Sequence, residues 1–438
     1  MTQELTSAKP ANSSPGGQEG PGVSPKRVRI IGLDGVRGLL CLSIAITHVT
    51  GHYSPTTAGI WKTNLFGFSL VYFFVLSGFL LSLPFIRTVI KERDAAIMPN
   101  VTDYTVHRLA RIMPAYIVIF LICNFLLRVS YVENPALQPP GTDQGTGMIT
   151  DPGQLLANVT LTQSYFPAYL QTGINPSWSL TLEYAFYAAL PVLFLGVFAM
   201  RKRINMNPFL LASLVPGGLL VLGLAGRAFI PLVNAHAGTT DFMLLNWGPN
   251  WAAVFTKSFL TNADNFALGM AAAILFVAIE RGALPDRVTR RIRLVSVVAI
   301  LPVLLASGVL LVVATQFVTA GVGMVAALMI LVIVVPLAQH RKSRLATALD
   351  FRPIRFVGEI SLSAYLWHFP VLLLLGRLGW MAGDTLPGML ANIVLLLTVT
   401  ILFASITYYL IEKPVMNYAK RLRAPKVAQP VDAQVKAS

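Results

Sequence analysis

The chain has 438 residues, of which 55% are hydrophobic and only 12% are charged. A soluble globular domain carries about a quarter charged residues, so this composition argues against a soluble chain and predicts apolar surface facing lipid. The formal net charge of +15 would favour nucleic-acid binding in a soluble protein. Here, however, the basic residues form short runs between apolar segments, as in loops held on the cytoplasmic side of a membrane.

In chain order, a polar segment rich in Ser, Pro and Gly comes first, and we expect residues 1–27 to form a disordered cytoplasmic tail. Residues 28–416 are predicted to form a membrane-embedded domain, and 417–438 a basic cytoplasmic tail. A membrane helix needs roughly 20 apolar residues. The segments that meet this length are approximately 31–52, 65–86, 109–130, 179–199, 209–232, 259–279, 293–313, 316–338, 358–377 and 386–411. The predicted fold class is all-α, a polytopic membrane helix bundle of about ten spans.

Loop charge predicts the orientation of this bundle. Basic clusters precede the first segment and follow every even-numbered one, whereas the alternate loops carry almost no basic residues. By the positive-inside rule both termini are cytoplasmic, and we expect a multi-pass protein of the cytoplasmic (inner) cell membrane. The longest outer loop, 129–177, is rich in Pro and Gly and then in aromatic residues. Such a loop is either a lid or binding loop, or a simple tether.

Ionisable groups within the spans mark candidate functional residues, because each costs at least about 2.5 kcal/mol to insert. Arg37 and His48 in the first span are eleven residues apart, so they share one helix face about 16 Å apart along the axis. In the alternative reading, Arg37 reaches to the membrane edge and His48 is a packing residue. Glu183 is predicted near the outer end of its span and Glu359 near the cytoplasm, so depth favours Glu183 as the carboxylate partner of His48.

A basic pair opens the third predicted span. Arg108 and Arg111 are three residues apart and therefore neighbours on a helix face. Paired arginines suit phosphate groups, whereas the simpler interpretation is a topology anchor. No His, Asp or Glu cluster has the spacing of metal ligands, so we expect no metal site and no permanently bound cofactor.

Taken together, six motifs in order resemble those of acyltransferase family 3, a family of integral membrane acyltransferases. They are Leu33-Asp34-Gly35-Val36-Arg37-Gly38 with His48; Phe73-Phe74-Val75-Leu76-Ser77-Gly78-Phe79; Arg108-Leu109-Ala110-Arg111-Ile112 with Pro114 and Tyr116; Trp178-Ser179-Leu180 with Glu183, Phe186, Tyr187 and Pro191; Ser361 with Tyr365-Leu366-Trp367-His368; and Tyr408 with Ile411-Glu412-Lys413-Pro414. The family often has Ser-Tyr where this chain has Ser361-Leu362, which is a mild departure. The short tail resembles the stand-alone form, without the hydrolase-like domain that many relatives carry.

The resemblance implies transfer of an acyl group, often acetyl, to a hydroxyl of a polysaccharide, glycolipid or similar envelope acceptor. It implies a catalytic role for His48, assisted by Arg37, and donor binding by Arg108 and Arg111. We further expect supporting or channel-lining roles for Tyr72, Ser77, Trp178, Tyr187, Glu359, Ser361, Tyr365 and His368.

The resulting hypothesis places acyl-CoA, as co-substrate, on the cytoplasmic side, with its phosphates on Arg108 and Arg111 and with Arg37 as an additional contact. The acceptor hydroxyl enters from the outer side, and His48, oriented by Glu183, acts as general base or as a covalent acyl carrier. A transporter or flippase would also place charges inside a bundle, but it predicts repeat symmetry and interrupted helices in both halves, which the sequence does not show. A purely structural scaffold leaves the buried Arg37 and His48 unexplained.

Overall fold

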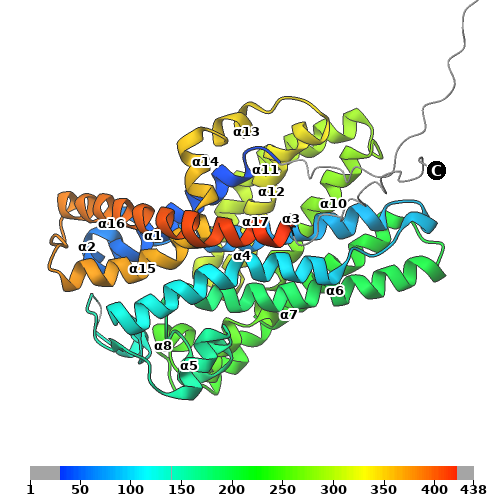
Figure 1. Ribbon diagram of the computed structural model, residues 1–438. Helices are drawn as coiled ribbons and strands as arrows, with labels where there is room; N and C mark the ends of the chain where they lie inside the picture. Colours follow the sequence, from blue (N-terminus) through cyan, green and yellow to red (C-terminus); the bar gives the residue numbers. More distant parts are fainter. Residues whose placement is uncertain (1–29, 140, 422–438) are drawn as a thin grey trace, which may run out of the picture. The chain divides into compact units, whose positions relative to one another are not determined.

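The computed structural model describes residues 30–139 and 141–421, and these fold almost entirely into helices (Figure 1). The α-helices are α1 Leu33–Tyr53, α2 Pro55–Trp61, α3 Ser69–Val89, α4 Val101–Leu121, α5 Pro152–Val159, α6 Trp178–Arg203, α7 Pro208–Ala235, α8 Phe242–Trp247, α9 Trp251–Thr256, α10 Ala263–Glu280, α11 Asp286–Val313, α12 Val318–Ala338, α13 Arg344–Leu349, α14 Arg352–Glu359, α15 Ser361–Arg377, α16 Leu386–Thr407 and α17 Lys413–Arg421. Two-residue strands β1 Ser130–Tyr131 and β2 Thr146–Gly147 pair antiparallel.

Shorter helical turns connect these elements. They are the π-helices η3 Ile122–Leu127 and η10 Tyr408–Glu412, and the 3₁₀ turns η1 Thr63–Phe68, η2 Arg93–Ala95, η4 Pro135–Leu137, η5 Gln163–Tyr165, η6 Pro167–Tyr169, η7 Asn175–Ser177, η8 Phe259–Thr261 and η9 Thr315–Phe317. Within the described residues nine helices are long and apolar enough to cross a membrane, or ten if the bent pair α14–α15 is one span. The prediction of an all-α polytopic bundle of about ten spans is confirmed.

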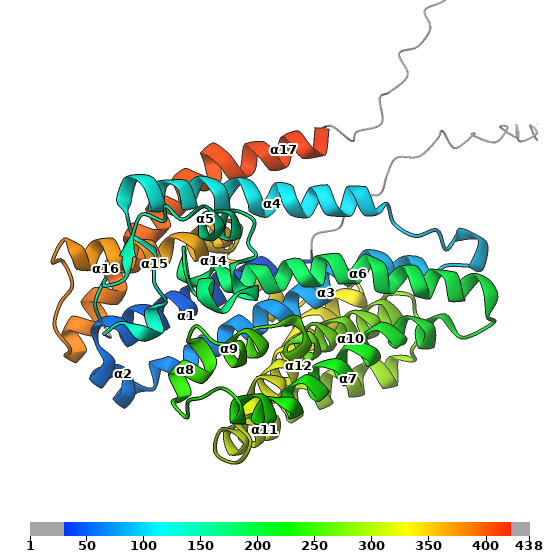
Figure 2. The same cartoon turned by 90° about the horizontal axis from the view of Figure 1, so that it is seen from below.

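The helices pack in two groups around α1. In Figure 2, α17 runs beside α4, while α7, α10, α11 and α12 gather on the far side of α3 and α6. Helix α10 is buried over nearly its whole length between α3, α7 and α12, whereas α11 exposes a long apolar face. An exposed apolar helix face is what a lipid-facing span requires. Which side of the membrane each end faces remains a prediction from loop charge.

The span predicted at 358–377 is not one straight helix. Helices α14 and α15 are bent by 76° at a break after Glu359. The bend lays α14 across the start of α1 at very close range: a Cβ on Gly358 would lie 1.8 Å from the carbonyl oxygen of Asp34, and one on Gly38 would lie 2.6 Å from that of Ile354. Only glycine permits such an approach. These contacts hold the segment that carries Arg37.

The third span begins earlier than predicted. Asn100 caps α4, its side chain accepting a hydrogen bond from the backbone N–H of Asp103. Since the helix starts at Val101, Arg108 and Arg111 lie about 10 and 15 Å inside it. The expectation that this pair sits at the very start of a span is wrong, and the pair instead faces the interior of the bundle.

The long outer loop is folded into the bundle. Its polar side chains Asn134, Asn158 and Gln163 are almost fully buried, and Asn134 Nδ2 donates to the carbonyls of Leu170 and Trp247 at 3.0 and 2.9 Å. Tyr116 of α4 donates to the carbonyl of Asn158 at 2.7 Å. A simple tether would leave these groups in solvent, so that interpretation is wrong.

The two predicted tails fall largely outside the described residues. Nothing in the structure bears on 1–27 or 422–438. The described part of the predicted C-terminal tail, 417–421, continues α17 and is helical.

Candidate active site

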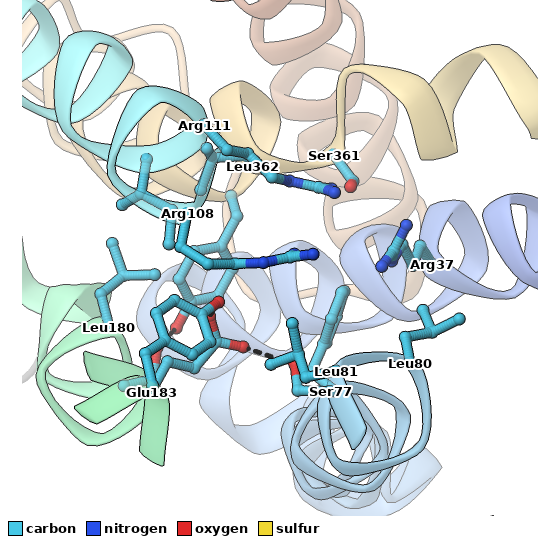
Figure 3. Close-up of a pocket in the computed structure, with 15 residues that line it drawn as sticks. Arg37, Ser77, Leu80, Leu81, Arg108, Arg111, Leu180, Glu183, Ser361 and Leu362 are labelled. Atoms are coloured by element: carbon cyan, nitrogen blue, oxygen red, sulfur yellow. Dashed lines mark hydrogen bonds between the residues drawn. The ribbon is translucent and has the colours of Figure 1, made fainter. Parts of the chain in front are cut away.

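A pocket between α1, α3, α4, α6 and the start of α15 contains about 710 Å³ of empty space, part of it open to the surroundings. Its apolar lining comes from residues such as Phe73, Leu80 and Leu180. Its polar and charged lining residues are Arg37, Ser77, Arg108, Arg111, Ser179, Glu183, Tyr187, Ser361 and Tyr365. Residues predicted from five separate motifs therefore meet in one cavity (Figure 3).

Three guanidinium groups converge on this pocket from two helices. Figure 3 shows Arg108 and Arg111 of α4 reaching toward the space that Arg37 of α1 enters from the opposite side. Arg37 is also 3.2 Å from the carboxylate of Asp34, one turn earlier in α1. Glu183 is the one carboxylate in the lining, so the lining carries two positive charges in excess. An apolar-walled site with excess guanidinium charge suits a ligand with several negative charges.

Glu183 belongs to this pocket and not to His48. Its carboxylate accepts hydrogen bonds from the hydroxyls of Ser77 at 2.9 Å and Tyr187 at 2.7 Å. No hydrogen bond joins it to His48 in the described part of the chain, so the predicted His48–Glu183 pair is wrong. The reason lies in the last part of the preceding loop, where Leu170, Thr172 and Ser177 are almost fully buried. Helix α6 consequently starts inside the bundle, and Glu183 lines the same cavity as Arg37.

The partner of His48 is His368. Nδ1 of His48 lies 2.8 Å from Nε2 of His368, and Nδ1 of His368 lies 2.5 Å from the backbone carbonyl oxygen of Tyr365. His368 is 1% exposed, whereas His48 is half-buried. The sequence singled out each histidine, but it did not predict this pair, which joins positions 320 residues apart.

Tyr365 connects the pocket to the histidine pair. Its hydroxyl donates to the carbonyl of Pro176 at 2.9 Å and lies 2.7 Å from the hydroxyl of Ser179, and its side chain lines the pocket. Its own carbonyl holds His368 one helical turn later. Tyr365 therefore lines the arginine pocket with its side chain and holds the histidine pair with its carbonyl, one turn of α15 before His368.

Three residues expected in the channel lie elsewhere. The hydroxyl of Tyr72 contacts the sulfur of Met329 on α12. Glu359 pairs with Arg355 at 3.6 Å on α14, and its side chain is 41% exposed. Trp178 packs its ring against Trp247, and Nζ of Lys257 lies 3.4 Å from the ring centroid of Trp247.

Sequence reasoning missed one buried ion pair. Arg227 of α7 and Asp264 of α10 form two hydrogen bonds, of 2.9 and 3.0 Å, with side chains 5% and 0% exposed. Both residues sit in apolar segments, so the rule that singled out Arg37 and His48 would also have found them. Neither lines the pocket, and the pair joins two helices. Among residues 30–139 and 141–421, no group of three or more His, Cys, Asp or Glu side chains could hold a metal ion.

Comparison with known proteins identifies relatives along the whole bundle. The chain is 27% identical over 414 residues to acyltransferase MdmB of Streptomyces mycarofaciens, an alignment that covers 91% of this chain and 95% of MdmB. It is 26% identical over 401 residues to the putative peptidoglycan O-acetyltransferase YrhL of Bacillus subtilis (strain 168), covering 90% of this chain and 56% of YrhL. For O-acetyltransferase OatA of Staphylococcus aureus (strain NCTC 8325 / PS 47), the identity is 23% over 395 residues, covering 88% and 57%.

The chain thus spans nearly the full length of MdmB and a little over half the length of YrhL and OatA. No solved structure matches it. Residues 30–409 match the family described as "Acyltransferase domain", which is acyltransferase family 3. This match includes every motif residue that lines the pocket or forms the histidine pair. The resemblance that the motifs indicated is therefore confirmed, and the chain belongs to acyltransferase family 3.

Proposed function

We propose that the protein is a membrane O-acyltransferase that moves an acyl group from acyl-CoA to a hydroxyl of an envelope acceptor. Family membership and relatives named acyltransferase and O-acetyltransferase support O-acyl transfer. The observation that carries the rest is the placement of three arginines in one pocket, one helical turn from a histidine pair. A polyanionic donor and a proton-accepting group are the two components that acyl transfer from a CoA thioester requires.

The arginine pocket is the proposed donor site. Coenzyme A carries several phosphate charges, and guanidinium groups bind phosphate through bidentate charge-assisted bonds. Arg108 and Arg111 supply the main contacts, with Arg37 facing them across the cavity. The phosphate-free pantetheine arm then follows the apolar part of the lining toward Tyr365. Glu183, held by Ser77 and Tyr187, limits the positive charge and fixes two hydroxyls in the wall.

His48 is the proposed general base. It is the half-buried member of the histidine pair, so it is the one an acceptor hydroxyl can approach. His48 takes the hydroxyl proton as the oxygen attacks the thioester carbonyl, and the carbon–oxygen bond forms as the carbon–sulfur bond breaks. The proton then passes to the departing thiolate, leaving coenzyme A as the thiol. A positioned base contributes about 10²–10⁴-fold.

The same atoms allow a two-step route. His48 would first attack the thioester itself, releasing the thiol, and the acyl-imidazole would then be cleaved by the acceptor hydroxyl. Rapid-quench mass spectrometry of protein mixed with acetyl-CoA distinguishes the routes, because only the second leaves an acetyl group on the peptide that contains His48.

The acceptor is proposed to come from the cell envelope. YrhL is named as a putative peptidoglycan O-acetyltransferase, which makes a hydroxylated glycan or glycolipid the first class to test. We place the acceptor on the outer side, beneath the folded 129–177 loop, and the donor on the cytoplasmic side of the cell membrane, in agreement with the loop-charge prediction.

The test uses purified full-length protein in detergent with acetyl-CoA as the donor probe. We expect release of free thiol, measured colorimetrically, to be at least 100-fold slower in His48→Ala than in wild type. Arg203→Ala, which removes an exposed arginine at the end of α6, should match wild type. Failure of the wild-type protein to bind acetyl-CoA would overturn the assignment of the donor. Movement of an intact substrate across a vesicle membrane, without cleavage, would favour a transporter instead.

A further inference from the structure

We infer that His368 is a positioning residue that fixes the tautomer of His48, so that Nε2 of His48 is the atom that accepts the proton. This inference rests on the proposed role of His48 as general base. It concerns a residue that does not line the donor pocket and that therefore acts through another side chain.

The two rings are placed for a hydrogen bond that lies in the plane of both. They are parallel to within 5°, and their centroids are 5.0 Å apart. With Nδ1 of His48 only 2.8 Å from Nε2 of His368, this separation corresponds to rings lying edge to edge in almost one plane, not face to face. The N–H bond and the lone pair of an imidazole both lie in the ring plane, so the alignment is close to ideal.

The backbone decides which nitrogen carries hydrogen. The carbonyl oxygen of Tyr365 can only accept, so Nδ1 of His368, 2.5 Å away, must be the N–H. A neutral imidazole has one N–H and one lone pair, which leaves a lone pair on Nε2 of His368. That nitrogen accepts from Nδ1–H of His48. The lone pair of His48 is consequently on Nε2, the ring nitrogen that faces away from His368.

The same arrangement prepares the pair to receive a proton. Once Nε2 of His48 takes the acceptor's proton, its Nδ1–H can move to Nε2 of His368, and Nδ1–H of His368 remains bonded to the Tyr365 carbonyl. Either ring can therefore hold the charge without losing a hydrogen bond. In the described part of the chain, neither ring has a carboxylate hydrogen-bond partner, unlike the histidine of a serine hydrolase triad.

Few other groups compete for these nitrogens. His52 lies one turn beyond His48 on α1, but its ring packs edge-on against Phe369 and Tyr53. Phe369 of α15 also presents its ring to His48, with centroids 5.2 Å apart. Among the described residues, His52 from α1 and Tyr365 from α15 are titratable groups near the pair, and the hydroxyl of Tyr365 is bonded to the carbonyl of Pro176.

The first test compares His368→Asn and His368→Ala with His236→Asn in detergent, using acetyl-CoA cleavage. An asparagine amide can donate or accept, so it removes the tautomer preference while keeping a polar group. We expect kcat to fall about 10- to 100-fold with the KM for acetyl-CoA changed less than twofold. His236, exposed just beyond α7, serves as the matched control. Wild-type kcat in His368→Ala, which leaves Nδ1 of His48 without this partner, would overturn the inference.

The second test needs no activity and so separates this inference from the donor assignment. Nitrogen-15 NMR of wild-type protein labelled at histidine distinguishes an N–H from a bare ring nitrogen, and His48→Asn and His368→Asn spectra assign the signals. We expect Nδ1–H on both rings and a bare Nε2 on His48. Hydrogen on Nε2 of His48 in the neutral pair would overturn the inference even if acetyl-CoA proves to be the donor. The expected tautomers in a protein that does not cleave acetyl-CoA would leave the inference standing and reject only the donor.

Discussion

Donor binding by the arginine pocket gives the sharpest test of the proposed function. Arg108→Ala and Arg111→Ala each remove a guanidinium that faces the cavity. A charge-assisted hydrogen bond contributes about 1.5–3 kcal/mol, so each substitution should weaken acetyl-CoA binding roughly 10- to 150-fold. Arg111→Lys keeps the charge but loses the bidentate fork, and its dissociation constant should lie between those of wild type and Arg111→Ala.

The assay is isothermal titration in detergent with two ligands, acetyl-CoA and S-acetylpantetheine. The second has the thioester and part of the arm but none of the phosphates. If the arginines bind phosphate, wild-type protein should prefer acetyl-CoA strongly, and this preference should be smaller in each alanine variant, because each removes one of the three pocket arginines. The protein–ligand double-mutant cycle then isolates the arginine–phosphate coupling. Arg203→Ala is the control for a lost surface charge.

Two results would refute this reasoning. An equal loss of affinity for both ligands would place the arginines at the thioester end or in the folding of the pocket. Unchanged affinity for acetyl-CoA in both alanine variants would reduce the pair to topology anchors, the simpler interpretation of the sequence.

Three further predictions follow from other contacts. His48→Ala should lower kcat about 10²–10⁴-fold while titration shows unchanged acetyl-CoA binding; weakened binding would move His48 into the donor site. Arg227→Met should destabilise the protein by about 3–5 kcal/mol, because it strands the buried charge of Asp264, and the Arg227→Met/Asp264→Leu double variant should recover most of the loss in detergent unfolding. No recovery would mean that the pair does more than join α7 to α10. Arg377→Gln breaks the half-exposed ion pair with Asp143 at 2.9 Å. Amide hydrogen exchange should therefore rise at residues 141–147 with little change in Tm. Unchanged exchange would show that other contacts hold the segment between strands β1 and β2.

The spans were predictable because bilayer thickness sets the length of an apolar segment. The break between α14 and α15 was not, since the apolar character at the predicted 358–377 span gives no sign of a 76° bend. Its cause is the docking of Gly358 on the backbone of α1, a contact between segments more than 300 residues apart. The close fit explains why glycines occupy positions 38 and 358, but a single sequence does not say which segments these glycines bring together.

The sequence predicted which residues form the candidate site but not which of them are hydrogen-bond partners. Arg37, Arg108, Arg111 and Glu183 all line one pocket, and sequence reasoning had selected all four. The error, the predicted pairing of Glu183 with His48, came from the depth assigned to Glu183 in its span. Counting residues from the end of an apolar segment placed Glu183 near the outer surface, because nothing in the sequence shows that the preceding loop folds into the bundle. Because that loop is hydrogen-bonded inside the bundle, α6 starts there, and Glu183 lines the same pocket as the arginines.

Because His368, and not Glu183, is the partner of His48, the charged groups lie apart from the proposed general base. A carboxylate beside His48 would have placed a negative charge at the reacting centre. In the structure, the three arginines and Glu183 line the pocket. The outer nitrogen of the histidine pair, Nδ1 of His368, instead bonds to the neutral carbonyl of Tyr365. In the proposed mechanism the guanidiniums bind the polyanionic donor, and the imidazole pair accepts the transferred proton. Substitutions should separate accordingly, with changes to the arginines appearing in donor affinity and changes to the histidines in kcat, because the arginines line the pocket and the histidines do not.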